Sequence, residues 1–158
     1  MYPWGNTSMA DVYPIEPGVK VMRGNDAAPG EFPHQVYLSY KRNGQQYMCS
    51  ASIIHPLFLL TAAHCVFNMA PATINLVTGE YDLSHTDGTE QHSRVSSIII
   101  HEKYDARTLV NDIAILVLQS AIKLDNFTNL IKIPEADQIL PGKIPVTHVK
   151  LNHRSHGH

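Results

Sequence analysis

The sequence has few charges, few cysteines and no long apolar run. Charged residues make up 16% of its 158 residues, and the net charge at neutral pH is -2. Lys and Arg form no cluster of five or more, so we expect neither a nucleic-acid partner nor an anionic membrane surface. No segment approaches the roughly 20 consecutive apolar residues of a membrane span, so we expect no membrane partner.

The two ends of the chain lack the sequence pattern of a folded core. Residues 1–20 contain Pro3, Pro14 and Pro17, which disfavour a regular element, and we interpret them as a propeptide-like leader. They show no basic start followed by an apolar run, so no signal peptide is visible. Residues 143–158 include four histidines and few turn-forming residues, and we interpret them as a His-rich tail.

Cysteine is limited to Cys49 and Cys65. Two thiols alone are compatible with free, metal-bound or paired side chains. Composition does not decide among these states. A bond between them would indicate an oxidising compartment and nothing more specific.

Short apolar or alternating runs separated by turn residues predict an all-β fold. Such a series with polar connections is typical of a closed antiparallel barrel or a sandwich. The last run is compatible with a buried strand or a helix, and its β-branched content favours a strand. The six predicted strands are 35–40, 47–54, 57–60, 74–77, 94–100 and 113–118.

Two segments carry the most specific signal. Residues 60–65 read LTAAHC and contain His64, and residues 111–116 read NDIAIL and contain Asp112. In residue type, order and spacing they resemble the blocks around the catalytic histidine and aspartate of the chymotrypsin-like serine proteases, also called trypsin-like. The resemblance extends from about residue 20 to about residue 142.

A third match is weaker and lies before the first predicted strand. Residues 21–24 read VMRG, follow Lys20 and resemble the activation site of the family, cleaved between Lys20 and Val21. Arg23 departs from the glycine expected at its position. His34, within FPHQV, departs from the usual aromatic residue.

The resemblance implies roles for four residues. His64 would be the general base of the reaction, and Asp112 would orient its ring and stabilise the imidazolium. Cys49 and Cys65, sixteen positions apart, would form the disulfide that the family places beside this histidine. Without the resemblance, a lone His before Cys would be interpreted as structural or solvent-exposed. A lone Asp opening a strand would be read as a turn or cap residue.

The third catalytic residue of the family has no match in the sequence. No Gly-Asp-Ser-Gly segment occurs, and the serines after Asp112 are Ser120 and Ser155. The resemblance therefore implies a six-stranded antiparallel β-barrel at residues 21–142. This would be the first barrel of a two-barrel fold, truncated before the barrel that carries the serine, the oxyanion hole and the specificity pocket.

We therefore expect a serine endopeptidase homologue that is inactive without the barrel that carries the serine. Its relatives hydrolyse peptide bonds in proteins by acyl transfer, meet protease inhibitors and are secreted. The alternative is a non-catalytic, protease-like module that binds inhibitors or regulatory partners.

A loop at residues 79–91 is rich in acidic side chains. Its spacing resembles the calcium-binding loop of trypsin-like proteases, and Ca²⁺ prefers six to eight oxygen ligands. The alternative is a solvated acidic loop without a metal. We expect no organic cofactor. The candidate ligands are Glu80, Asp82, His85, Asp87 and Glu90.

Overall fold

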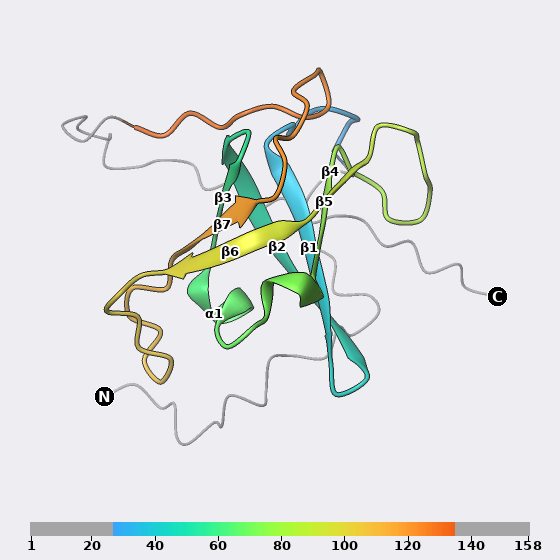
Figure 1. Cartoon of the computed structure of the whole chain (residues 1–158). Coiled ribbons are helices and arrows are strands. Elements are labelled where there is room, and N and C mark those ends of the chain that lie inside the picture. Colours follow the sequence, from blue (N-terminus) through green and yellow to red (C-terminus); the bar gives the residue numbers. More distant parts are fainter. Residues whose placement is uncertain (1–26, 135–158) are drawn as a thin grey trace, which may run out of the picture.

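The computed structural model describes residues 27–134 of the chain (Figure 1). This part is almost entirely β-structure, with one helical turn, α1 (Ala63–Val66), and one 3-10 turn, η1 (Pro71–Thr73). The strands are β1 (Gln35–Arg42), β2 (Gln45–His55), β3 (Phe58–Thr61), β4 (Ile74–Thr78), β5 (Gln91–Ser93), β6 (Val95–Ile100) and β7 (Ala114–Leu118).

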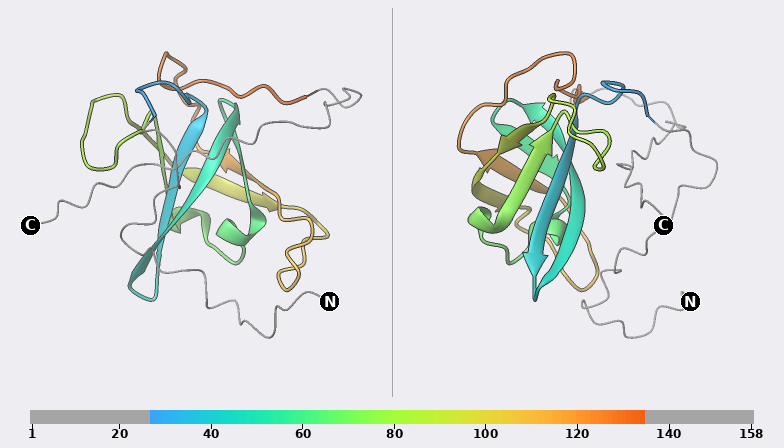
Figure 2. Two further views of the ribbon diagram at one scale, coloured as in Figure 1. Left: turned by 180° about the vertical axis from the view of Figure 1, so that it is seen from behind. Right: turned by 90° about the vertical axis from the view of Figure 1, so that its right-hand side faces the viewer.

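The seven strands form one curled antiparallel sheet in the order β5-β4-β1-β2-β3-β7-β6. The two end strands, β5 and β6, are separated in sequence only by Arg94. Because β5 pairs with β4 and β6 pairs with β7, this stretch connects both edges of the sheet. The sheet therefore curls round as one barrel (Figure 2). The all-β, antiparallel prediction is confirmed, with β5 as a short strand additional to the six predicted.

The inner face of the sheet forms the core. In β7 the residues alternate between buried and partly exposed, and Ala114, Leu116 and Leu118 point inward. β4 alternates in the same way, and Leu38 of β1 and Leu59 of β3 are fully buried between them. Complete burial of a side chain of this size stabilises the fold by roughly 1.5–3 kcal/mol. The period-2 pattern of the sequence thus creates the barrel interior.

Tight turns set the register of the longest hairpin. Between β1 and β2, Asn43 and Gly44 have φ angles of 51° and 78°. Two successive positive φ values suit the right-handed twist of a hairpin, and Asn-Gly adopts them readily. At its other end β2 stops at His55, immediately before Pro56, where the sequence predicts a turn.

The two ends of the barrel carry different structures. The turn α1 and the loop 101–113 lie at one end, whereas the loop 79–90 leaves the opposite end (Figure 1). In the described part of the chain, no helix has the length and apolar character needed to cross a membrane.

Candidate active site

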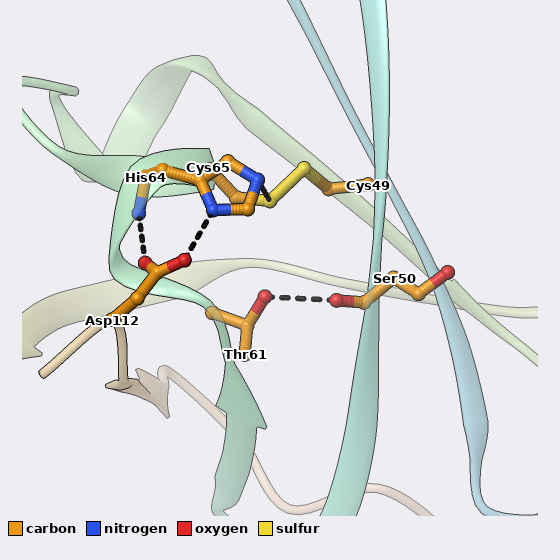
Figure 3. Close-up of polar contacts among 6 residues, drawn as sticks. All are labelled: Cys49, Ser50, Thr61, His64, Cys65 and Asp112. Carbon is orange, nitrogen blue, oxygen red and sulfur yellow. Dashed lines mark hydrogen bonds and ion pairs between the residues drawn. A yellow bond between two sulfur atoms is a disulfide. The ribbon is translucent and has the colours of Figure 1, made fainter. Parts of the chain in front are cut away.

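The turn α1 places His64 at the end of the barrel. Ahead of it, β3 ends at Thr61, whose hydroxyl donates a hydrogen bond of 2.8 Å to the carbonyl of Ser50 on β2 (Figure 3). Ala63 and Val66 of α1 are fully buried. Since these residues hold one side of the turn in the core, the imidazole of His64 faces outward, with 42% of its side chain exposed.

Asp112 lies near the same end of the barrel, two residues before β7. Counting back from the inward-facing Ala114, Ile113 is exposed and Asp112 is partly buried. Asp112 lies in a tight turn closed by the hydrogen bond from the N–H of Ile113 to the carbonyl of Asn111, so this turn and not the strand sets the direction of its carboxylate. The exposed fraction of this side chain is 23%.

Both carboxylate oxygens of Asp112 accept hydrogen bonds from His64. Oδ1 accepts from the backbone N–H at 2.8 Å, and Oδ2 lies 2.6 Å from the ring Nδ1 (Figure 3). The first bond satisfies a backbone donor in the opening turn of α1, which has no intrahelical partner. The second is short, as expected for a bond to an ionised group. Two bonds from one residue fix the ring relative to the carboxylate.

The hydrogen bonds from His64 determine the charge of Asp112. Burial raises the pKa of this carboxyl, but the side-chain and backbone hydrogen bonds from His64 together hold it below its ordinary value. Asp112 is therefore ionised at neutral pH and has no proton to share. The proton in the contact therefore belongs to Nδ1, so Nε2 is the ring nitrogen that can act as a proton acceptor.

Nε2 of His64 lies beside the disulfide. Cys49 of β2 and Cys65 of α1 are bonded, with Cα atoms 6.2 Å apart, and the Sγ of Cys65 is 3.4 Å from Nε2. A disulfide sulfur has no proton to donate, so this contact is van der Waals packing of the ring against the disulfide and not a hydrogen bond. The bond ties α1 covalently to β2, so it restrains the turn that carries His64.

The described residues contain one group of three potential metal ligands within 4.8 Å of one another: Cys49, His64 and Cys65. Both sulfurs belong to the disulfide, and zinc is bound by the thiolate form of cysteine. This group is therefore a histidine packed against a disulfide and not a metal centre.

Hydrogen bonds between neighbouring residues of the acidic loop determine its shape. Asp82 Oδ1 accepts hydrogen bonds from the backbone N–H and the hydroxyl of Ser84, at 3.0 and 2.7 Å. Glu90 accepts the N–H groups of Asp87 and Gly88, at 2.6 and 2.8 Å. His85 Nδ1 lies 3.4 Å from Asp82 Oδ2. The carboxylates of Asp82 and Glu90 therefore shape the loop.

Glu80 has a different environment within this loop. Its Oε1 is buried and has no hydrogen-bond partner among the described residues. Burial is the main cause that raises the pKa of Glu80, and the negative charges of Glu90 and Asp87 raise it further. A cation beside Glu80 would relieve this repulsion and give the unpaired oxygen a partner, although no three carboxylate or imidazole groups of this loop come within 4.8 Å of one another in the described residues.

The predicted site residues thus fall into three groups. The structure brings His64, Asp112 and the two cysteines together, and it keeps the five loop residues apart from them at the other end of the barrel. Lys20 and Val21 lie outside the described residues, as does the tail. Thr61 and Asn111 lie within the two segments that carry the resemblance, but the sequence reasoning gave neither a role; the structure shows a hydroxyl hydrogen bond for Thr61 and a positive φ for Asn111.

Comparisons with known proteins point to one family. The family model described as Trypsin matches residues 21–157. Trypsin-1 of Astacus astacus is 35% identical over 131 residues, which cover 80% of this chain and 55% of that protein. Chymotrypsin-C of Mus musculus is 35% identical over 84% of the chain and 50% of its own length. Chymotrypsin-like elastase family member 3B of Homo sapiens is 34% identical over 82% and 49%. The chain spans about half the length of these relatives.

Proposed function

The chain belongs to the trypsin family, and on that premise we propose that it supplies the acid–base half of a serine endopeptidase active site. The observation that carries the proposal is the double hydrogen bond between His64 and Asp112, at 2.8 and 2.6 Å. One bond orients the backbone of the histidine and the other orients its ring. A general base needs this restraint, because the proton acceptor must stay aligned with the reacting hydroxyl.

The proposed chemistry is the one established for this family of proteases. Nε2 of His64 takes the proton of a serine hydroxyl as the oxygen attacks the carbonyl carbon of a peptide bond. The same proton then passes to the leaving amine, and an acyl-enzyme remains. Asp112 stabilises the imidazolium in between without taking the proton itself. Water then attacks the acyl-enzyme, and the same base assists the release of the acid.

The 158 residues by themselves are proposed to be inactive as a peptidase. The sequence contains no Gly-Asp-Ser-Gly segment, and neither Ser120 nor Ser155 has a related context. Without a nucleophile, water attack assisted by His64 would lack oxyanion donors and a substrate pocket. In such triads, loss of the nucleophile alone removes most of the rate enhancement.

The substrates of the complete site are proposed to be peptides and proteins, and the place of action outside the cell. The family resemblance supports both. The disulfide between Cys49 and Cys65 is compatible with an oxidising compartment.

A chimera tests the catalytic proposal. Residues 21–142 would be joined to the remainder of the Astacus astacus trypsin, which by family resemblance carries the serine. A fluorophosphonate probe should label the chimera, and neither His64→Ala nor the unfused chain should be labelled. His55→Ala is the matched control, because His55 is an exposed histidine at the far end of β2. Labelling that survives His64→Ala but not His55→Ala would contradict the assignment.

A second candidate function is binding without catalysis. It is favoured by exposed apolar side chains on both sides of Asp112 in the loop 101–113, namely Leu109, Val110 and Ile113. Such residues next to an open histidine suit the docking of an extended peptide or of a protease inhibitor. The unfused chain should then bind an immobilised protein inhibitor of trypsins, and Leu109→Ser should weaken the binding. No measurable binding would remove this candidate.

We also propose that the loop 79–90 binds Ca²⁺, with Glu80 as the central ligand. The support is the buried, unpartnered Oε1 of Glu80 and the raised pKa of its carboxyl. Asp87, Glu90 and backbone carbonyls of the loop, at Asp82 and His85, would complete the set. The ion would stabilise the loop and take no part in the acyl transfer.

A further inference from the structure

Two residues of the loop 101–113 have left-handed backbone conformations. The φ angles of Leu109 and Asn111 are 56° and 57°. For leucine this conformation is strained, and such strain persists only where the surrounding structure imposes it. Asparagine tolerates it better than most residues. Asn111 directly precedes Asp112, so its conformation sets the direction in which the chain enters β7.

Two hydrogen bonds, one from the side chain and one to the backbone carbonyl, hold Asn111 in this conformation. Its side-chain Nδ2 donates a hydrogen bond of 2.8 Å to the carbonyl of Lys103 across the loop. Its own carbonyl accepts a hydrogen bond of 2.8 Å from the N–H of Ile113. The second bond encloses Asp112 in a tight turn, because it joins the residues on either side of it.

The rest of the loop supports the same arrangement. The N–H of Asp105 donates to the carbonyl of Val110 at 3.0 Å, and the N–H of His101 donates to the carbonyl of Ile113 at 3.1 Å. The loop is thus closed at its base and again near its tip. The amide of Asn111 lies between these two closures and connects the segment that carries Asp112 to the first part of the loop, after β6.

We propose that Asn111 is a positioning residue for the His64–Asp112 pair. Its left-handed backbone and its amide bond to Lys103 fix the direction from which the carboxylate of Asp112 meets both N–H groups of His64. Asn111 touches neither a substrate nor the ring, and it acts through Asp112 alone. The catalytic meaning of this role rests on the proposed function, whereas the geometry can be measured without turnover.

The two contributions of Asn111 can be separated by substitution. Asn111→Gly keeps access to a positive φ but removes the amide bond to Lys103. Asn111→Ala removes the amide and also penalises the backbone conformation. We therefore expect a graded loss of the His64–Asp112 contact, partial in the glycine variant and complete in the alanine variant.

The test is proton NMR of the full 158-residue chain with its disulfide intact. A short bond from Nδ1–H to a carboxylate gives a resolved low-field proton resonance. In the parent chain we expect this resonance, and we expect it to disappear with Asp112→Asn. It should be lost in Asn111→Ala and broadened in Asn111→Gly, and the pKa of the Asp112 carboxyl should move up towards its ordinary value in both.

Asn43→Ala is the matched control. Asn43 has the same residue type and a similar φ of 51°, but it lies in the β1–β2 turn. This variant should lose stability and retain the low-field resonance. A folded Asn111→Ala variant with an unchanged resonance and an unchanged Asp112 pKa would overturn the proposal. If Asn111→Ala does not fold, the same two readouts in Asn111→Gly decide, and unchanged values there also overturn it.

The outcome is independent of the proposed activity. An unlabelled chimera together with a lost resonance in Asn111→Ala would reject the peptidase proposal and keep the positioning role. A labelled chimera together with an unchanged resonance would keep the peptidase proposal and reject the positioning role.

Discussion

The two ends of the barrel are held by different kinds of contact. At the α1 end, the hydrogen bonds between His64 and Asp112 join residues 48 positions apart, and the disulfide joins residues 16 apart. In the acidic loop at the other end, the carboxylates of Asp82 and Glu90 accept hydrogen bonds from residues two or three positions away. The catalytic pair therefore depends on the folded barrel, whereas the acidic loop is shaped largely by its own sequence.

Gly79, at the start of the acidic loop, takes part in a contact over a longer distance in sequence, because its partner Thr89 is ten positions away. Gly79 has a φ of 71°, and a Cβ there would lie 2.2 Å from the carbonyl oxygen of Thr89. The hydroxyl of Thr89 donates to the carbonyl of Gly79 at 2.9 Å. Only glycine allows this close approach, which brings the two ends of the loop together.

Removing the disulfide should have the largest effect on stability, and this effect should be confined to the α1 end of the barrel. We expect the double variant Cys49→Ala with Cys65→Ala to lower the free energy of unfolding by about 3 kcal/mol, because the crosslink closes a loop of this size. Urea unfolding measures the loss. The low-field resonance of His64 should weaken, and the pKa of Asp82 at the other end should not move. Unchanged stability would show that the core alone holds α1.

Asp112→Asn should have the next largest effect, about 1.5 kcal/mol, because it removes hydrogen bonds to a charged acceptor. The parent chain should also depend on pH. The folded pKa of Asp112 is lowered, so its stabilisation is complete above the unfolded value of about 3.9 and is lost as the pH falls through the folded value. Urea unfolding of both proteins between pH 7 and pH 2 measures the difference. Equal pH profiles would contradict this assignment.

Calcium should stabilise only the acidic-loop end. At ten times its dissociation constant, Ca²⁺ bound to the folded state alone adds about 1.4 kcal/mol. Thermal unfolding with millimolar Ca²⁺ should show the increase, and Glu80→Gln should abolish it. Without calcium, Glu80→Gln should be slightly more stable than the parent chain at neutral pH, because burial and neighbouring charges raise the pKa of Glu80 and disfavour its ionised form. No thermal shift in the parent chain would reject the site.

The smallest effect should come from Ser84→Ala. Ser84 donates both its N–H and its hydroxyl to Asp82, and these bonds are the main cause that lowers the pKa of that carboxyl. Loss of the hydroxyl should cost about 0.5–1 kcal/mol. NMR titration should show the pKa of Asp82 rising while that of Asp112 stays unchanged. Movement of both values would mean that the two ends are coupled.

The strands were predictable because the inward residues follow a period of two. The predicted strands 74–77, 94–100 and 113–118 correspond to β4, β6 and β7 with small differences at their ends. β5 was missed because its three residues, Gln91, His92 and Ser93, are all polar and too few to show a period. It forms because it continues β6 across Arg94 and pairs with the free edge of β4.

The turn that carries His64 was not predictable from periodicity. α1 has four residues, about one turn, and an apolar stripe needs at least two turns to be recognised. His64 itself was identified from the resemblance of its surrounding segment to a protease family. Its outward direction and its 3.4 Å contact with the Cys65 sulfur follow from how Ala63 and Val66 pack into the barrel.

The sequence by itself determined the class of fold and the chemical types of the site residues, because alternation and short motifs are local properties. Only the tertiary structure decided which of these residues meet. Asp112 reaches both N–H groups of His64 because β3 and β7 pair at Thr61 and Ala114, which brings the end of one strand beside the start of the other. That pairing depends on contacts between residues far apart in sequence, so no local pattern encodes it.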